Sequence, residues 1–153
     1  MYKTGDHVIC KSGGVWKVLE SSAGKMTLAL HESGEEKKLR LSDDDEIVRN
    51  IANKEDILEA ISRIPFIRTI QAPNDKIRRE LYEEAMSKFD EAEWIKVIKS
   101  THLRGESGRL AQYETEYAQK AKNFLHGEIS AIMGIPVSEV EDYISSAIYR
   151  DKC

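Results

Sequence analysis

Apolar residues in the first 48 positions alternate with polar ones over short runs. Glycine and serine residues separate the runs, at Ser12-Gly13-Gly14, Ser22-Ala23-Gly24 and Ser33-Gly34. A period of two is typical of β-strands, and such breaks are typical of turns between antiparallel neighbours. The pattern predicts strands over 8–11, 15–19, 26–30, 38–41 and 47–48. A flat sheet of this size leaves one apolar face in water, so we expect it to curl into a small open antiparallel β-barrel.

Beyond residue 48, apolar residues recur at the three- and four-residue intervals of amphipathic helices. Five helices are predicted, with capping side chains at their starts: Asn53, Asn74, Asp90, Ser107 and Ser138. Pro65 is expected to end the first helix and Gly134 the fourth. The sequence thus predicts an α+β chain with the β-barrel over 1–48 and an all-α domain of about five helices over 52–150.

The composition is that of a folded chain, with 41% hydrophobic and 33% charged residues among 153. No apolar run approaches the roughly 20 residues of a membrane span, and we expect no membrane contact. The N-terminus shows no apolar core of a signal peptide. Cys10 and Cys153 do not form a disulfide framework, so we expect reduced thiols and a cytoplasmic location. We expect Cys10 to be a small apolar strand residue.

The net charge of −4 argues against a protein that coats nucleic acid by bulk charge. Both predicted domains are mildly acidic: residues 1–48 hold 7 basic and 9 acidic side chains, and residues 49–153 hold 16 and 18. Residues 63–79 differ, because they contain one acid, Asp75, against five cations: Arg63, Arg68, Lys76, Arg78 and Arg79. This stretch carries the one strong local positive field in the sequence.

Two features of this helical half allow more than one interpretation. Arg78 and Arg79 follow Asn74 in the first turns of a predicted helix, where positive charge is unfavourable. A nearby phosphate would relieve this cost. Salt bridges along the same helix would do so equally well, with Glu80, Glu83 and Glu84 as the partners. Similarly, Trp94 fits a place in the helical core better than insertion between base pairs.

Motifs of catalysis are missing from the sequence. It contains no Gly-rich phosphate loop, no His-Glu-x-x-His and no Cys-x-x-Cys. The four histidines lie on different predicted elements, whereas a metal site needs several converging ligands: His7, His31, His102 and His126. We therefore expect no catalytic residue, no metal site and no cofactor.

Several short segments resemble the CarD family of bacterial transcription regulators. Tyr2-Lys3-Thr4-Gly5-Asp6-His7-Val8-Ile9 resembles the family's Phe/Tyr-Lys-x-Gly-Asp-x-Val-Val start. Gly13-Gly14-Val15-Trp16-Lys17-Val18 matches its first turn and second strand, and Lys38-Leu39-Arg40-Leu41-Ser42 a later strand. The helical half follows the family's order through Arg78-Arg79, Phe89-Asp90-Glu91, Ile95-Lys96-Val97-Ile98 and the long helix ending at Gly134.

This resemblance implies a non-catalytic transcription regulator. Its first domain would be a Tudor-like module, similar to one in transcription-repair coupling factors, that binds the RNA polymerase β subunit by adding strand to strand. Arg40 would lie at that contact with Leu39 and Leu41 facing the core, and further cations there would be Lys38 and Lys25.

The helical domain would hold promoter DNA through its phosphates without reading base sequence. The expected contacts are Lys76, Arg78 and Arg79, supported by Arg63, Arg68 and Arg104. Many family members place a tryptophan before the arginine pair, whereas this chain has Asn74-Asp75-Lys76, so we expect weak, electrostatic DNA binding. The main alternative is a protein-interaction module that binds polymerase or another partner without DNA. A small enzyme is a second alternative, which no motif supports.

Overall fold

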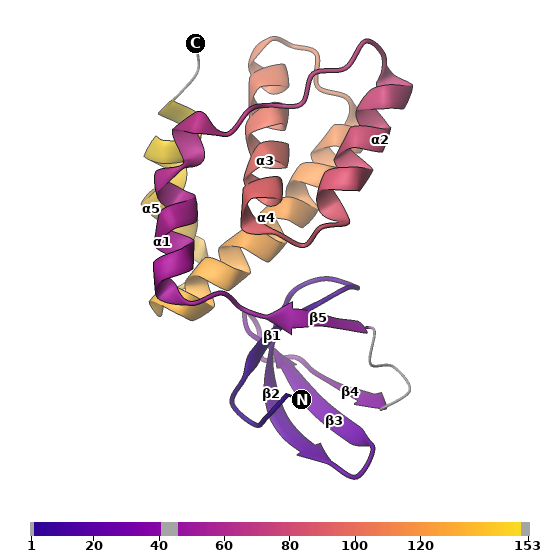
Figure 1. The fold of residues 1–153 in the computed structure, drawn as a ribbon, viewed down its shortest axis with the longest axis vertical. Coiled ribbons are helices and arrows are strands. Elements are labelled where there is room, and N and C mark those ends of the chain that lie inside the picture. Colours follow the sequence, from indigo (N-terminus) through magenta and orange to yellow (C-terminus); the bar gives the residue numbers. More distant parts are fainter. Residues whose placement is uncertain (1, 41–45, 151–153) are drawn as a thin grey trace.

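The computed structural model describes residues 2–40 and 46–150, and these form an α+β fold with one antiparallel sheet and five α-helices. Figure 1 shows the sheet at one end of the molecule and the helices bundled above it. The strands are β1 (His7–Cys10), β2 (Val15–Ser22), β3 (Lys25–Leu30), β4 (Glu36–Arg40) and β5 (Ile47–Asn50). The helices are α1 (Lys54–Ser62), the short 3-10 helix η2 (Ile64–Phe66), α2 (Asp75–Met86), α3 (Glu91–Glu106), α4 (Gln112–Met133) and α5 (Val137–Arg150).

The strands form one sheet in the order β4-β3-β2-β1-β5, and all neighbours are antiparallel. Strands β1 to β4 form the predicted meander, and β5 returns to pair with β1. Among the described residues the sheet is not closed, with β4 and β5 as its edges, and the expected barrel stays a prediction. Lys37 Nζ of β4 lies 3.0 Å from Oε2 of Glu46, the residue before β5, and Glu46 also accepts hydrogen bonds from Ser12 in the turn after β1.

The sheet is buried on both faces near its centre. Alternate residues of a strand face opposite sides, and one side holds a small apolar cluster formed by Val8, Cys10, Trp16, Val18, Leu28 and Ile47. Ile9 and Val15 belong instead to the core of the helices. Gly127 of α4 allows this approach, because a Cβ there would lie 3.0 Å from Val15 Cγ2. Sheet and bundle thus share one core, and the division into domains at 48 and 52 stays a prediction.

Local capping starts three helices where the sequence predicts. Asn53 Oδ1 accepts from the N–H of Asp56, and Asn74 Oδ1 accepts from the N–H of Ile77, at 2.8 Å and 2.9 Å. The carboxylate of Asp90 accepts from the N–H of Ala92 at 3.1 Å. Each bond satisfies an N–H group that has no partner within the helix. The predicted end of α4 is also confirmed, with Gly134 in the left-handed conformation at φ 71°.

The predicted starts of the last two helices are wrong. Ser107 ends α3 instead of starting α4, and Gly108 follows in the left-handed conformation at φ 75°. Helix α4 begins at Gln112, where the carboxylate of Glu114 accepts from the N–H of Ala111 at 2.8 Å. Helix α5 begins at Val137, directly after Pro136, one residue before the predicted cap. Glycine and proline thus set these boundaries more strongly than serine does.

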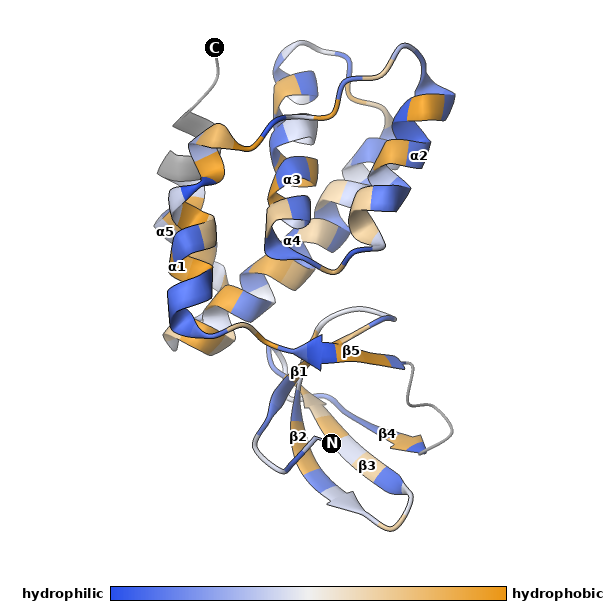
Figure 2. Cartoon of the chain, viewed as in Figure 1, coloured by the Kyte–Doolittle hydropathy of each residue, from blue (hydrophilic) through white to orange (hydrophobic). Residues whose placement is uncertain are grey.

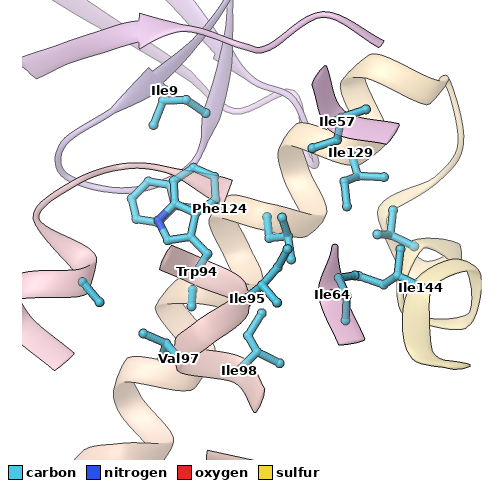
Figure 3. Close-up of a cluster of buried hydrophobic side chains, with 14 of the residues drawn as sticks. Ile9, Ile57, Ile64, Trp94, Ile95, Val97, Ile98, Phe124, Ile129 and Ile144 are labelled. Atoms are coloured by element: carbon cyan, nitrogen blue, oxygen red, sulfur yellow. The ribbon is translucent and has the colours of Figure 1, made fainter. Parts of the chain in front are cut away.

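The helices enclose a core centred on two aromatic rings. Figure 2 shows hydrophobic and hydrophilic residues alternating along α1, α3 and α4, as expected for helices with one buried side. Trp94 of α3 stacks on Phe124 of α4, with ring centroids 5.1 Å apart and an interplanar angle of 8°. Figure 3 shows Ile9 of the sheet beside this stack. Trp94 has no exposed surface, so its core interpretation is confirmed and insertion into DNA is excluded.

Arg49 of β5 joins the sheet to two helices. Its Nη1 lies 2.7 Å from Glu128 Oε2 of α4, and its Nη2 lies 2.8 Å from Glu91 Oε2 of α3. Its Nε donates to the carbonyl of Phe89 at 2.9 Å. The Glu128 side chain is fully buried and also accepts from the N–H of Ala52 at 2.7 Å. Because a buried carboxylate needs a partner, this arrangement holds β5 against α3 and α4.

Two carboxyl groups thus share one guanidinium at this junction. Burial, together with a hydrogen bond and repulsion from Glu128, raises the pKa of Glu91 from 4.5 to about 7, although Arg49 opposes the rise. The folded protein therefore retains a proton at Glu91 between pH 4.5 and about 7, where the unfolded chain has lost it. The stability that this proton provides is present at low pH and lost as the pH rises towards 7.

Glu91→Gln tests this linkage, because glutamine keeps the shape of the protonated carboxyl group and cannot titrate. Between pH 5 and 7.5 we expect the free energy of unfolding of the wild type to fall relative to the variant, by at most about 1.4 kcal/mol per pH unit. Urea unfolding at several pH values measures the difference. Glu116→Gln on the exposed side of α4 is the control and should follow the wild type. Parallel pH profiles for wild type and Glu91→Gln would contradict the linkage.

Candidate functional site

The predicted DNA-binding residues gather at the end of the helix bundle that lies farthest from the sheet. Figure 1 shows that this end is formed by the C-terminal ends of α1 and α3, η2, the segment before α2, and the loop between α3 and α4. Arg63 caps the end of α1, and Arg68 lies in the segment before α2. Lys76, Arg78 and Arg79 occupy the first turns of α2, and Arg104 the last turn of α3. The fold therefore brings together residues 63–79 and the end of α3.

Arg78 is held within the protein. Its Nη1 lies 2.6 Å from Asp75 Oδ1, and its Nη2 donates to the carbonyl of Ala72 at 3.2 Å. Asp75 Oδ1 also accepts from the Tyr113 hydroxyl at 3.1 Å. Only 12% of the Arg78 side chain is exposed. Asp75 thus neutralises one arginine at the start of α2 and ties that helix to α4.

Arg79 has a different environment. Its guanidinium lies over the ring of Tyr113, 3.9 Å from the centroid, in a cation–π contact. This contact orients the guanidinium but leaves its charge without a carboxylate partner among the described residues. The salt bridges considered above from Arg78 and Arg79 to Glu80, Glu83 and Glu84 are therefore wrong. Instead, Glu83 accepts from the Tyr117 hydroxyl, and Glu84 lies 4.0 Å from Lys88.

Arg104 pairs with a buried acid. Its Nε donates to Glu114 Oε1, and its Nη2 donates to the carbonyl of Arg109 at 2.9 Å. The Glu114 side chain is fully buried. Besides the bonds from Arg104 and from the N–H of Ala111, it accepts one from the Tyr82 hydroxyl at 2.9 Å. Arg104 thus fixes the loop between α3 and α4.

At this end of the bundle four cations have no acidic partner among the described residues, and we call them the distal surface: Arg68, Lys76, Arg79 and Arg109. All four side chains belong to exposed residues. Arg63 adds a cation that is shared with Glu59, 2.6 Å away. Sequence reasoning missed Arg109 because it placed this residue inside a helix, whereas the left-handed Gly108 puts it in a loop. The arrangement can bind anionic groups, since several exposed cations lie at one end of the bundle and the Tyr113 ring orients one of them, Arg79.

The predicted polymerase-binding residues share the outer face of the β3–β4 hairpin. Lys25 is the register partner of Arg40, and Lys38 lies two residues before Arg40 on the same face. All three are exposed, while Leu39 packs against the apolar cluster of the sheet as expected. Leu41 lies outside the described residues. β4 is an edge strand, so its outer backbone groups have no strand partner within the described sheet. Such an edge can accept another strand.

The histidines stabilise the junction between sheet and helices. His31 Nε2 lies 2.9 Å from Ser130 Oγ of α4, and the Ser130 hydroxyl donates to the carbonyl of Ile135. His31 therefore donates from Nε2, and burial lowers its pKa so that the ring is neutral at pH 7. His7 contacts the His31 ring edge-on at 5.5 Å. The Ser130 hydroxyl proton is used in the bond to the Ile135 carbonyl, so it cannot also be donated to the His31 imidazole.

Cys10 is a buried, free thiol of β1, as predicted. Burial raises its pKa to about 11, so the reactive thiolate is scarce at neutral pH. The structure does not describe Cys153.

The described residues contain no group of three or more histidine, cysteine, aspartate or glutamate side chains that could hold a metal ion. Within residues 2–40 and 46–150, no helix combines the length and the apolar character needed to cross a membrane. No protein-family model matches the chain, and a search of curated proteins finds no match.

Arg104→Ala tests whether Arg104 stabilises the fold or is available to bind a ligand. We expect it to reduce the free energy of unfolding by about 2–3 kcal/mol, because the buried Glu114 loses its cation. Adding Glu114→Gln should restore part of the loss. Arg68→Ala is the control and should change stability by no more than about 0.5 kcal/mol. Urea unfolding measures all three, and equal stability of Arg104→Ala and wild type would show that Arg104 is free to bind a ligand.

Proposed function

We propose that the protein is a non-catalytic bacterial transcription regulator of the CarD type, which binds RNA polymerase through its sheet and promoter DNA through its helices. The observation that carries the proposal is the separation of two basic surfaces at opposite ends of one rigid core. One is the outer face of β3 and β4 beside an open strand edge, and the other is the distal surface of the bundle. A protein of this form can touch two partners at once.

The sheet is the proposed contact for the polymerase β subunit. Its Tudor-like character is part of the proposal and is supported by the short, curled, antiparallel strands. Strand addition at β4 would supply backbone hydrogen bonds, and the exposed Lys25, Lys38 and Arg40 would add contacts to an acidic surface. The basic face and the open backbone edge lie on the same hairpin, so one partner strand can meet both.

The distal surface is the proposed contact for DNA. Arg68, Lys76 and Arg79 lack acidic partners among the described residues, and Arg79 is oriented by Tyr113. A few exposed cations bind phosphates without distinguishing bases. Arg78 and Arg104 have internal partners, which makes the contact smaller than the sequence predicts and favours weak binding. The same observation favours the second candidate, a module that binds polymerase without touching DNA.

Charge reversal tests the polymerase contact. Arg40→Glu is expected to weaken binding to the β subunit by about 1–3 kcal/mol, because it places like charge in an electrostatic interface. Lys54→Glu, at the first residue of α1 and outside the β3–β4 hairpin, is the matched control and should bind normally. Co-purification with bacterial polymerase measures both. If equal amounts of polymerase co-purify with the two variants, the β3–β4 face is not the polymerase contact.

A triple variant, Arg68→Ala with Lys76→Ala and Arg79→Ala, tests the DNA contact. We expect a shorter lifetime of the open promoter complex, with unchanged binding to free polymerase. The dependence of binding on log salt should become shallower by about 0.9 for each phosphate contact that is lost.

The control for this triple variant replaces two exposed lysines: Lys54, the first residue of α1, and Lys88, in the turn that follows α2. Figure 1 shows that these ends of α1 and α2 point away from the end of the bundle that carries the distal surface. A DNase footprint on the promoter complex provides an independent readout. If the protein adds no protection upstream of the melted region and the triple variant acts as wild type, the module without DNA contact is correct.

A further inference from the structure

Phe66 is the most exposed of the large hydrophobic side chains in the described part of the chain. Its exposed fraction is 83%, whereas that of the next one, Tyr143 of α5, is 45%. Phe66 ends η2, which lies at the same end of the bundle as the distal surface, and neither contact proposed above includes it. Because an apolar ring in water is unfavourable, a partner that covers the Phe66 ring gains free energy.

The backbone on both sides of Phe66 is fixed to α3. Figure 1 shows the segment from α1 to α2 crossing α3 near its C-terminal end. There, Lys99 Nζ donates to the carbonyls of Ile64 and Ile67, at 2.8 Å and 2.9 Å. The Ile64 side chain is fully buried, and Ile67 packs against the helical core. The outward position of the Phe66 ring is therefore set by the fold on either side of it.

A groove of about 350 Å³ lies beside this ring, and it is lined by Phe66 together with Arg68 and Leu103. Thr69 and Gln71 add a hydroxyl and an amide group to the lining. The described residues that line the groove include cations and no acid. A groove of this size can accept one small planar group against the exposed ring.

The charge beside Phe66 favours a polyanion as the partner. Arg68 belongs both to the groove and to the distal surface. Arg63 at the end of α1 shares its charge with Glu59, yet 70% of its side chain is exposed. Cations that follow a phosphate backbone, combined with an aromatic ring on which a base can stack, are typical of sites for single-stranded nucleic acid. The bases of a duplex are stacked on one another, so only unpaired bases present a free face to such a ring.

We propose that this end of the bundle binds single-stranded DNA, with one unpaired base stacked on Phe66 and the neighbouring phosphates held by Arg68 and Arg63. The inference rests on the proposed DNA contact and specifies its form, because it makes the unpaired strand of a melted promoter the preferred ligand. Every base has a flat aromatic face, so this binding does not depend on base sequence.

Fluorescence anisotropy of the full chain with a labelled oligo(dT) of about 12 nucleotides tests the inference. We expect oligo(dT) to bind more tightly than a duplex of the same length. A strand with the same phosphates but abasic sugars should bind at least about fivefold more weakly than oligo(dT), because it has no base to stack. Phe66→Ala should weaken binding of oligo(dT) by the same factor and leave duplex binding unchanged, whereas Phe66→Trp should keep the affinity.

Tyr143→Ala is the matched control, because it removes an exposed aromatic ring from α5 and should bind as the wild type does. Urea unfolding verifies that Phe66→Ala remains folded, as expected for an exposed side chain. The inference is overturned if oligo(dT) binds the wild type no better than the abasic strand, or binds Phe66→Ala as tightly as the wild type. In either case the proposed DNA contact still holds if the triple variant of Arg68, Lys76 and Arg79 loses duplex binding. If neither oligo(dT) nor duplex binds the wild type, the inference and the proposed DNA contact both fail.

Discussion

The structure depends on the need to neutralise one buried carboxylate. Glu128 of α4 has no exposed side-chain surface, and its cation comes from β5, where Arg49 also binds Glu91 and the carbonyl of Phe89. Moving the sheet away from α3 and α4 would leave Glu128 charged and unpaired, which is far more costly than losing a surface ion pair. The apolar contacts of Ile9 and Val15 with the helical core act in the same direction. Together they fix the sheet on the bundle.

This fixed junction gives the proposed function its geometry. The outer face of β3 and β4 and the distal surface lie at opposite ends of the molecule, so neither can be reoriented without breaking the junction. Two weak contacts joined by a rigid spacer can bind together more strongly than either alone, provided that both partners sit at the matching separation. Under the proposed function, weak DNA contacts would therefore suffice, because the polymerase would hold the sheet near the promoter.

Local signals in the sequence predicted much of the fold. The caps Asn53, Asn74 and Asp90 satisfy backbone groups within three residues of themselves, so a reader of the sequence can find them. The start of α4 depends on Glu114, which is buried against Tyr82 and Arg104 from other helices, and no local pattern shows this. The role of Arg49 could not be predicted for the same reason, because its main partner, Glu128, is 79 residues away in the sequence.

Charge in the sequence is also a poor guide to charge at the surface. The chain has a net charge of −4, yet the acids Glu114 and Glu128 are fully buried, and the charge of each is offset by a paired arginine. Each takes up an arginine that the sequence alone cannot distinguish from a free one. Arg104 looks like Arg68 in the printed sequence, but only Arg68 is left exposed without an acidic partner among the described residues. The binding capacity of the distal surface is set by the cations that remain after internal pairing, and that remainder is a property of the fold.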